Sequence, residues 1–338
     1  MADPPLVVVK VVEVVAKVTG EDSPNRTGSR FGFHSTDLGI LWDDGSGRVL
    51  AAFGDTYGDG WAGPGAGPRS SDHRRNVLVR SAAPASALDG GLRLDQTVQD
   101  RPAHAAEILG SDSRPLLEST VIPTAGIAVD GVQYLHYMSV ARWRRKGWRT
   151  NYGGIARSDD GGRTWTKVRR ARWPNSLPAR RSFQLGAFAR DADWVYLFGV
   201  PNGRSGAISV ARVHPGSVDD VGAYRYWDGT GWSDRVRDAV EVCPGPAGEL
   251  SVAFHSGLGC WLMVYLHDAA GRIVLRSADA VTGPWSEEQT LVSGADHPAL
   301  YGGFLHPHGL DGSRIYFTMS QWVPYNVFLV RADLTRNS

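Results

Sequence analysis

Four carboxylates stand beside strand-like apolar segments of the sequence, where they could meet in one site. Asp37 opens one such segment, Asp55 follows another after Gly54, and Glu118 and Glu249 each open a further one. Glycoside hydrolysis requires paired carboxylates: one gives a proton to the leaving oxygen, and the other activates water or attacks the anomeric carbon. A third carboxylate can keep the acid protonated by like-charge repulsion. Each residue alone also fits a turn cap or an arginine partner, so the set rather than any one member indicates this chemistry.

Two histidines form a second group with possible chemistry. His306 and His308 flank Pro307, and side chains two residues apart on an extended segment point the same way. The pair could bind a metal ion, but structural hydrogen bonding is the simpler interpretation, because no cysteine or carboxylate adjoins it at ligand spacing. The sequence lacks a glycine-rich phosphate loop, a nucleophile elbow and a metalloprotease helix. We therefore expect no cofactor and no catalytic metal, and leave open an axial structural ion.

Amides and aromatic rings near the end of the chain are typical of a sugar-binding surface. The segment 320–326 contains Gln321, Trp322 and Asn326. Exposed aromatic rings stack on sugar faces, and side-chain amides exchange hydrogen bonds with hydroxyl groups. Most of the 12 tryptophans are expected in the core, but three others could join such a surface: Trp61, Trp143 and Trp148.

A strand pattern that ends in arginine recurs five times and indicates how these residues are positioned. The arginines, Arg80, Arg157, Arg212, Arg276 and Arg331, are separated by 77, 55, 64 and 55 residues. Such spacings are typical of propeller blades. Each segment follows an aromatic or β-branched strand and, before it, a candidate innermost strand, over 37–42, 121–129, 183–188, 250–254 and 301–305. The repeat predicts an all-β, five-bladed β-propeller whose inner strands bring the carboxylates to an axial funnel.

A ring of blades needs closure, because an open strand edge invites aggregation. The valine-rich segment 6–18 is the natural candidate to pair with the last blade. We therefore expect one domain over 1–338 whose N-terminal strand completes blade five. Cys243 and Cys260 fit a disulfide or two free core thiols equally well.

One turn carries a specific signature. Residues 158–165 match the Ser-x-Asp-x-Gly-x-x-Trp "Asp box" of sialidase-like propellers, and 277–285 is a looser relative. In this turn the aspartate caps backbone amides and the tryptophan packs between strands, so the box is interpreted as structural. A sialidase would need an arginine triad, and the five repeat arginines are predicted on outer strands, which disfavours that activity.

Composition argues against several classes of function. The formal net charge is +1, from 36 basic and 35 acidic residues, which argues against a nucleic-acid arm or a basic membrane-binding face. No apolar run approaches the roughly 18 residues of a membrane span. The first residues lack the basic start and apolar core of a signal peptide.

Six motifs, in order over nearly the whole chain, resemble the domain-of-unknown-function 4185 family. They occupy 36–39 (TDLG), 53–56 (FGDT), 118–124 (ESTVIPT), 248–252 (GELSV), 301–307 (YGGFLHP) and 320–326 (SQWVPYN). Members with an assigned activity form glycoside hydrolase family 183. They are endo-D-arabinanases, which cut α-linked D-arabinofuranose chains of mycobacterial arabinogalactan and lipoarabinomannan.

The resemblance implies a five-bladed propeller with a pair of essential aspartates, matched here by Asp37 and Asp55, and a further acidic residue, matched by Glu249. We expect inversion of configuration, with Asp37 as general base and Asp55 as acid. The expected substrate contacts are Glu118, Tyr301, His306, Gln321, Trp322 and Asn326. The resemblance further implies a secreted or wall-directed monomer whose partner is D-arabinan, without nucleic acid or membrane insertion. A glycan-binding propeller without catalysis, or a furanosidase of other specificity, remains an alternative.

Overall fold

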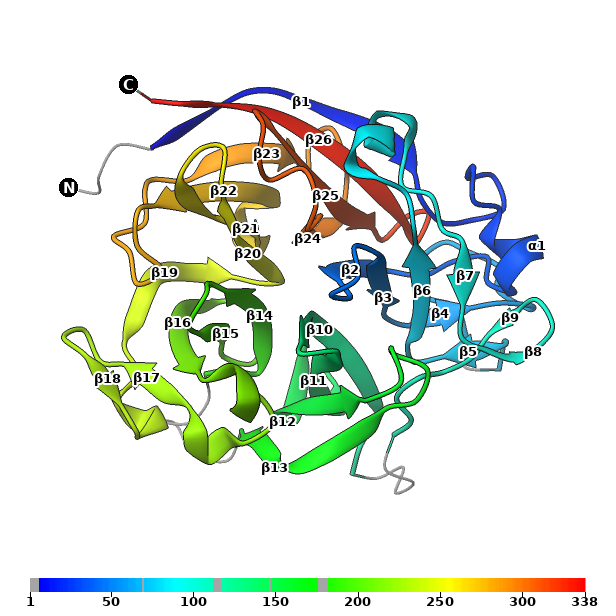
Figure 1. The fold of residues 1–338 in the computed structure, drawn as a ribbon. Helices are drawn as coiled ribbons and strands as arrows, with labels where there is room; N and C mark the ends of the chain where they lie inside the picture. Colours follow the sequence, from blue (N-terminus) through cyan, green and yellow to red (C-terminus); the bar gives the residue numbers. More distant parts are fainter. Residues whose placement is uncertain (1–5, 69, 112–116, 146, 176–181, 338) are drawn as a thin grey trace.

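Five antiparallel sheets stand around a central axis as the blades of a propeller (Figure 1). The computed structural model describes residues 6–68, 70–111, 117–145, 147–175 and 182–337. Within these residues the one α-helix is the five-residue α1 (Thr27–Phe31), and no helix is long and apolar enough to cross a membrane. The predicted all-β, five-bladed propeller is confirmed.

Each blade begins with an innermost strand and continues outward by hairpins. The first two blades contain β2 (Leu38–Asp43), β3 (Val49–Phe53), β6 (Val77–Ser81) and β7 (Gln96–Thr97), then β10 (Thr120–Val129), β11 (Val132–Trp143), β12 (Trp148–Ser158) and β13 (Thr166–Pro174). The third contains β14 (Leu185–Arg190), β15 (Val195–Val200), β16 (Gly206–Val213), β17 (Arg225–Trp227) and β18 (Trp232–Ser233), with β19 (Glu241–Ala247) also paired to β16.

The fourth blade contains β20 (Leu250–His255), β21 (Cys260–His267), β22 (Arg272–Ala278) and β23 (Gln289–Ser293). The fifth contains β24 (Leu300–Leu305), β25 (Arg314–Gln321), β26 (Asn326–Arg336) and β1 (Val7–Lys17). Two small ribbons extend the first blade: β4 (Thr56–Tyr57) with β5 (His73–Arg74), and β8 (Gln99–Arg101) with β9 (His104–Ala105). The five repeat arginines lie on the third strand of each blade, away from the axis, as the repeat predicted.

The ring is closed by the N-terminal strand, as expected. β1 runs antiparallel to β26, with Val7 opposite Arg336 and Lys17 opposite Phe328, and Figure 1 shows the two strands side by side. The closing strand is also tied to the fourth blade, because the Val9 amide donates to the Gln289 side chain at 3.0 Å. Pairing the first and last strands of the chain removes the open edge that a linear series of blades would leave.

Apolar side chains pack between neighbouring blades and form the core. Trp42 of β2 lies against Gly126 of β10, where a Cβ atom would collide with the indole ring. The indole N–H of Trp42 donates to the Gln133 side chain at 2.9 Å, which satisfies its buried polar atom. Cys243 and Cys260 are both buried and free, so the second alternative for the cysteines holds.

The Asp box is a self-contained turn between β12 and β13. Asp160 accepts hydrogen bonds from the amides of Arg163 and Thr164, both at 2.9 Å, and from the Thr164 hydroxyl at 2.7 Å. Burial alone would raise the pKa of Asp160, but these donors together outweigh it and hold the pKa well below its usual value. Every polar group of the carboxylate is used within the turn, which supports a structural role.

Removing this cap should cost stability. We expect Asp160→Ala to lower the free energy of unfolding by about 1–2 kcal/mol, the usual effect of losing a side chain that caps backbone amides. Asp159→Ala is the matched control: the contact of Asp159 within the described part of the chain is an exposed ion pair with Arg157, so its loss should cost well under that amount. Thermal and urea denaturation measure both variants, and equal losses would contradict the capping role.

Candidate active site

One end of the propeller axis opens into a cavity of about 640 Å³ that collects carboxylates from different blades. Asp37 precedes β2 and Glu249 precedes β20, so both lie where an innermost strand begins. Asp55 follows β3, which runs antiparallel to β2, and therefore lies at the same end. Because all innermost strands start at this end, Asp37 and Glu249 share one funnel although they are 212 positions apart in the sequence.

Two tyrosines hold Asp37, which is largely buried. Its Oδ2 accepts hydrogen bonds from the hydroxyl groups of Tyr301 and Tyr325, both at 3.0 Å. Its Oδ1 is buried without a hydrogen-bond partner among the described residues. Gly54 makes this position possible, since a Cβ atom there would collide with Oδ1. The glycine beside Asp55 therefore serves the close approach of Asp37.

The backbone around Asp37 is held in an uncommon conformation. Leu38 and Tyr325 both have positive φ angles, 67° and 61°, which non-glycine residues rarely adopt. The amide of Thr36 donates to the Tyr325 carbonyl at 3.0 Å, and the amide of Leu38 donates to the Ser320 hydroxyl at 2.8 Å. These bonds join the first blade to the fifth on both sides of Asp37 and hold the backbone of its partner Tyr325.

Burial raises the pKa of Asp37 to about 7, and the negative charges of Asp55 and Glu249 act in the same direction. The hydrogen bonds from Tyr325 and Tyr301 favour the ionised form and limit the rise. Burial and the neighbouring Asp37 charge in turn raise the pKa of Tyr301 and Tyr325 well above the usual value, so both remain hydrogen-bond donors. A carboxyl group with a pKa near neutrality is suited to exchange a proton in this cavity.

Asp55 is half-buried and held by a histidine. The Nε2 atom of His73 lies 3.0 Å from Oδ1 of Asp55. The imidazole ring stacks on Tyr57, with 4.8 Å between the ring centroids, so its orientation is fixed by packing. Sequence reasoning did not select His73; its position in the short ribbon β4–β5, opposite Tyr57, becomes evident only from the pairing of those strands.

Glu249 forms an ion pair with Arg204. The guanidinium donates to Oε1 of Glu249 through Nη2 at 2.6 Å and through Nε at 3.1 Å, while Oε2 is buried without a partner among the described residues. Arg204 lies between the rings of Trp148 and Tyr301, 5.5 Å from each centroid, and also contacts Asp268 at 3.3 Å. Burial alone would lower the pKa of Arg204, but these carboxylates raise it above the usual value. Arg204 lies in a hairpin without a motif, so sequence reasoning missed it.

Two exposed tryptophans stand at the rim of the cavity. Trp143, at the end of β11, is 46% exposed, and Trp322, between β25 and β26, is 48% exposed. Trp143 contacts Trp148 edge to face, with 6.0 Å between the centroids, and Trp322 contacts Tyr325 in the same manner at 5.4 Å. Rings that are supported on one edge and open on a face are suited to stack on sugars.

Four of the predicted substrate contacts do not reach this cavity. Glu118 is buried, accepts a hydrogen bond from Ser139 at 2.5 Å and pairs with Lys167 at 3.0 Å. Asn326 accepts a hydrogen bond from Thr19 at 2.7 Å, and Gln321 lies opposite it at the end of the β25–β26 hairpin. Asn326 therefore supports the turn that carries Trp322 and Tyr325. Trp322 and Tyr325, from the same motif, line the cavity, whereas the side-chain amides of Gln321 and Asn326 do not.

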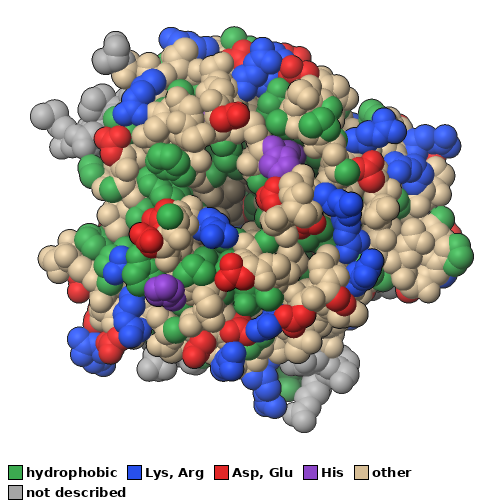
Figure 2. Space-filling view, viewed as in Figure 1, with side chains coloured by type: hydrophobic (Ala, Val, Ile, Leu, Met, Phe, Trp, Pro, Cys, Tyr) green, Lys and Arg blue, Asp and Glu red, His purple; other side chains and the backbone are tan. Residues whose placement is uncertain are grey.

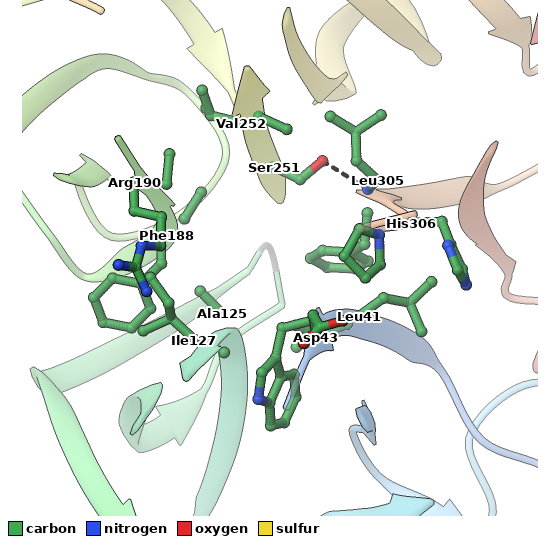
Figure 3. A pocket seen from close by; sticks show the side chains of 18 of the residues that line it. Leu41, Asp43, Ala125, Ile127, Phe188, Arg190, Ser251, Val252, Leu305 and His306 are labelled. Atoms are coloured by element: carbon green, nitrogen blue, oxygen red, sulfur yellow. Dashed lines mark hydrogen bonds between the residues drawn. The ribbon is translucent and has the colours of Figure 1, made fainter. Parts of the chain in front are cut away.

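The fourth residue, His306, lies at the opposite end of the axis. The face in Figure 2 is hollowed at the centre of the ring, and Figure 3 shows a second cavity, of about 370 Å³, lined by side chains of all five innermost strands. Burial lowers the pKa of His306 to about 4, so it is neutral near pH 7. His308 pairs instead with Asp43 at 2.6 Å. This second cavity is largely apolar and lacks clustered carboxylates, so the first cavity is the better candidate for catalysis.

The described residues contain no group of three or more His, Cys, Asp or Glu side chains placed to hold a metal ion. The carboxylates that share the funnel are placed to exchange protons with a bound molecule. The raised pKa of Asp37 favours it as the proton donor, opposite to the assignment expected from sequence. Asp55 is then the carboxylate available to accept a proton.

Comparison with known proteins agrees with this architecture. Residues 22–331 match the family described as "Domain of unknown function (DUF4185)". The chain is 32% identical over 332 residues to "Notoamide biosynthesis cluster protein J" of Aspergillus sp. (strain MF297-2), covering 90% of this chain and 84% of that protein. Solved structures of similar fold include the α-L-arabinofuranosidase PaAbf62A of Podospora anserina (TM-score 0.54, 11% identity, 98% of each chain covered) and a GH43_1 enzyme of Xanthomonas citri (TM-score 0.54, 14% identity, 90% and 88% covered).

Replacing Asp37 by asparagine should stabilise the folded chain at high pH. The pKa of the Asp37 carboxyl is about 7 in the folded chain and lower in the unfolded chain. The free energy of unfolding therefore falls as pH rises toward 7, and the whole of this loss is present above pH 7. We expect Asp37→Asn to raise the free energy of unfolding near pH 8, by up to about 4 kcal/mol at about 1.4 kcal/mol per pKa unit, and to leave it unchanged near pH 4. Urea denaturation across this range measures the difference.

Asp228→Asn provides a control of opposite sign. The backbone amides of Thr230 and Gly231 donate to the Asp228 carboxylate and hold its pKa below the usual value, so its charge stabilises the fold as pH rises. This variant should therefore not gain stability near pH 8. Equal behaviour of the two variants, or no gain in Asp37→Asn, would contradict the account of Asp37.

Proposed function

The chain belongs to the DUF4185 family, and from this membership and the carboxylates of the funnel we propose that it is a glycoside hydrolase that cuts internal linkages of D-arabinan. The observation that carries the proposal is that Asp37 and Asp55 line one cavity, where burial and the neighbouring negative charges raise the pKa of Asp37 to about 7. A protonated acid beside an ionised base is the arrangement that glycoside hydrolysis requires.

In the proposed reaction Asp37 donates its proton to the glycosidic oxygen as the bond from the anomeric carbon to that oxygen breaks. Asp55 accepts a proton from water, whose oxygen forms the new bond to the anomeric carbon. Charge balances, because one carboxyl loses the proton that the other gains, and configuration at the anomeric carbon inverts. His73 positions Asp55 through its hydrogen bond.

Glu249 acts in this proposal through Asp37. Its negative charge is one cause of the raised pKa of Asp37, so it keeps the acid protonated without itself transferring a proton. The ion pair with Arg204 fixes the position of that charge. The family resemblance predicts Glu249 as a further acidic residue beside the two aspartates, and the proposal gives it this indirect role.

The substrate class follows from the family resemblance and the shape of the site. Exposed rings on two blades, Trp143 and Trp322, border the cavity and could stack on successive sugars of a chain. The name of the Podospora protein, an arabinofuranosidase, indicates that a propeller of this fold can accept furanosides. We propose α-linked D-arabinofuranose chains of the mycobacterial cell wall as substrate, cut outside the cell by a secreted or wall-directed monomer.

A second candidate function rests on the curated relatives. They are 32% identical to this chain and are named for a notoamide biosynthesis cluster. A cavity of about 640 Å³ could also hold one small metabolite, on which the same two aspartates would catalyse proton transfer. Release of oligosaccharides from D-arabinan distinguishes the proposals, since an enzyme for a small metabolite would release none.

Removing either aspartate should abolish hydrolysis. We expect Asp37→Asn and Asp55→Asn each to lower kcat by about 10²–10⁴, the usual contribution of a general acid or base. Asp43→Asn, which makes the same change in the cavity at the opposite end of the axis, should keep wild-type activity. Oligosaccharide release from D-arabinan is the assay, and the anomer first formed is read by proton NMR. Unchanged products in both funnel variants would contradict the assignment of the two aspartates. Arabinan binding without turnover by the wild type would indicate a glycan-binding propeller.

The pH dependence should report the pKa of Asp37. Because the acid must be protonated, kcat/KM should fall as pH rises through about 7. Glu249→Gln removes a negative charge that raises this pKa, so the alkaline limb should move to lower pH. Glu241→Gln, which removes an exposed carboxylate on β19, is the control and should leave the limb in place. A limb that does not move in Glu249→Gln would show that Glu249 does not tune the acid.

A further inference from the structure

The hairpin tip between β11 and β12 carries an unusual concentration of positive charge. Four arginines, Arg142, Arg144, Arg145 and Arg149, are exposed within eight positions of the chain. Among the described residues no carboxylate pairs with any of them, whereas Arg157, on the same blade, pairs with Asp159 at 2.6 Å. We call residues 142–145 and 147–149 the basic hairpin.

The arrangement of these charges works against the stability of the hairpin. Arg142 lies directly opposite Arg149 across the two strands, and like charges in such a pair repel. The two strands are held beside this pair by the next pair, Trp143 opposite Trp148, and by the hydrogen bond from the Arg144 amide to the Gly147 carbonyl at 3.0 Å. Folding therefore does not require these charges, and a charged ligand would explain them.

The basic hairpin also borders the funnel. Trp143, Arg144, Gly147 and Trp148 line the candidate active-site cavity. The other arginine of that cavity, Arg204, is already neutralised by Glu249 and Asp268. Arg144 is thus a cavity-lining cation without an ion-pair partner among the described residues, and it directly follows an exposed aromatic ring.

We propose that the basic hairpin is a subsite for a negatively charged ester group, a carboxylate or a phosphate, on the glycan that enters the funnel. A sugar stacked on Trp143 would place its substituent near Arg144, which supplies planar donors suited to carboxylate and phosphate oxygens. The inference rests on the proposed function and narrows it, because the preferred substrate becomes an anionic arabinan rather than a neutral one.

The local character of the charge favours a substituted glycan over a nucleic acid or a membrane. The whole chain carries a net charge of only +1, so positive charge does not dominate its surface as a whole. Nucleic-acid and membrane surfaces are bound by extended basic stripes that contact many phosphates. A single charged tip beside a sugar-sized cavity matches one or two charges on one substrate unit.

The experiment compares two derivatives of the same D-arabinan at equal substitution: one succinylated, whose half-esters carry carboxylates, and one acetylated, whose esters are neutral. A phosphorylated arabinan forms a third arm that distinguishes carboxylate from phosphate. We expect the wild type to show a KM about 5–10-fold lower for an anionic derivative in low salt. The preference should shrink to within about twofold near 0.5 M NaCl, because salt screens exposed charges.

Arg144→Gln should lose most of this preference, and Arg144→Glu should reverse it. Arg93→Gln and Arg93→Glu are the matched controls, since Arg93 is also exposed and unpaired among the described residues but lies outside the cavity. A wild type that does not distinguish the derivatives, or equal losses at both positions, would overturn the subsite. Electrophoresis of each variant in gels that contain the derivatives measures binding directly, because a protein that binds the polymer is retarded. If the wild type hydrolyses no arabinan, the proposed function is refuted, but the gels still test the subsite. Retardation by RNA or anionic vesicles, with no preference between the arabinans, would also overturn it.

Discussion

The structure of the funnel depends on one enclosed carboxyl group. Asp37 lies beneath two tyrosine hydroxyls and against Gly54, with the charges of Asp55 and Glu249 nearby. Ionising it is costly because burial removes water and the neighbours repel the charge. Arg204 holds Glu249 by an ion pair, and His73 holds Asp55 by a hydrogen bond, so both neighbouring carboxylates have fixed positions beside Asp37.

Closure of the ring holds this group in place. Both tyrosines that contact Asp37 come from the fifth blade, whereas Asp37 itself precedes the first strand of the first blade. The segment after β1 reaches the same place, because Thr19 donates to Asn326, next to Tyr325. The N-terminal strand thus joins the two ends of the chain and also supports the turn that carries one tyrosine. Stability of the closure and geometry of the site are therefore coupled.

The sequence predicted the parts of this arrangement that follow from periodicity. The arginine-ended repeat located five innermost strands within two residues of their observed starts, and that register brought Asp37, Asp55 and Glu249 to one end of the axis. The sequence did not predict the contacts that depend on pairing between distant segments. His73 reaches Asp55 from a two-residue ribbon, and Arg204 reaches Glu249 from a loop without any motif. Glu118 opens an inner strand as predicted, but Ser139 and Lys167 hold it inside the second blade.

The most direct test of the account is the titration of Asp37 itself. In the folded chain labelled with ¹³C at aspartate carboxyl groups, the resonance is assigned by its absence in Asp37→Asn and followed by NMR across the pH range. We predict a midpoint at about 7, with a lower midpoint when Glu249 is replaced by glutamine. A midpoint near 4, the ordinary value for aspartate, would contradict the claim that this funnel is built around a protonated acid.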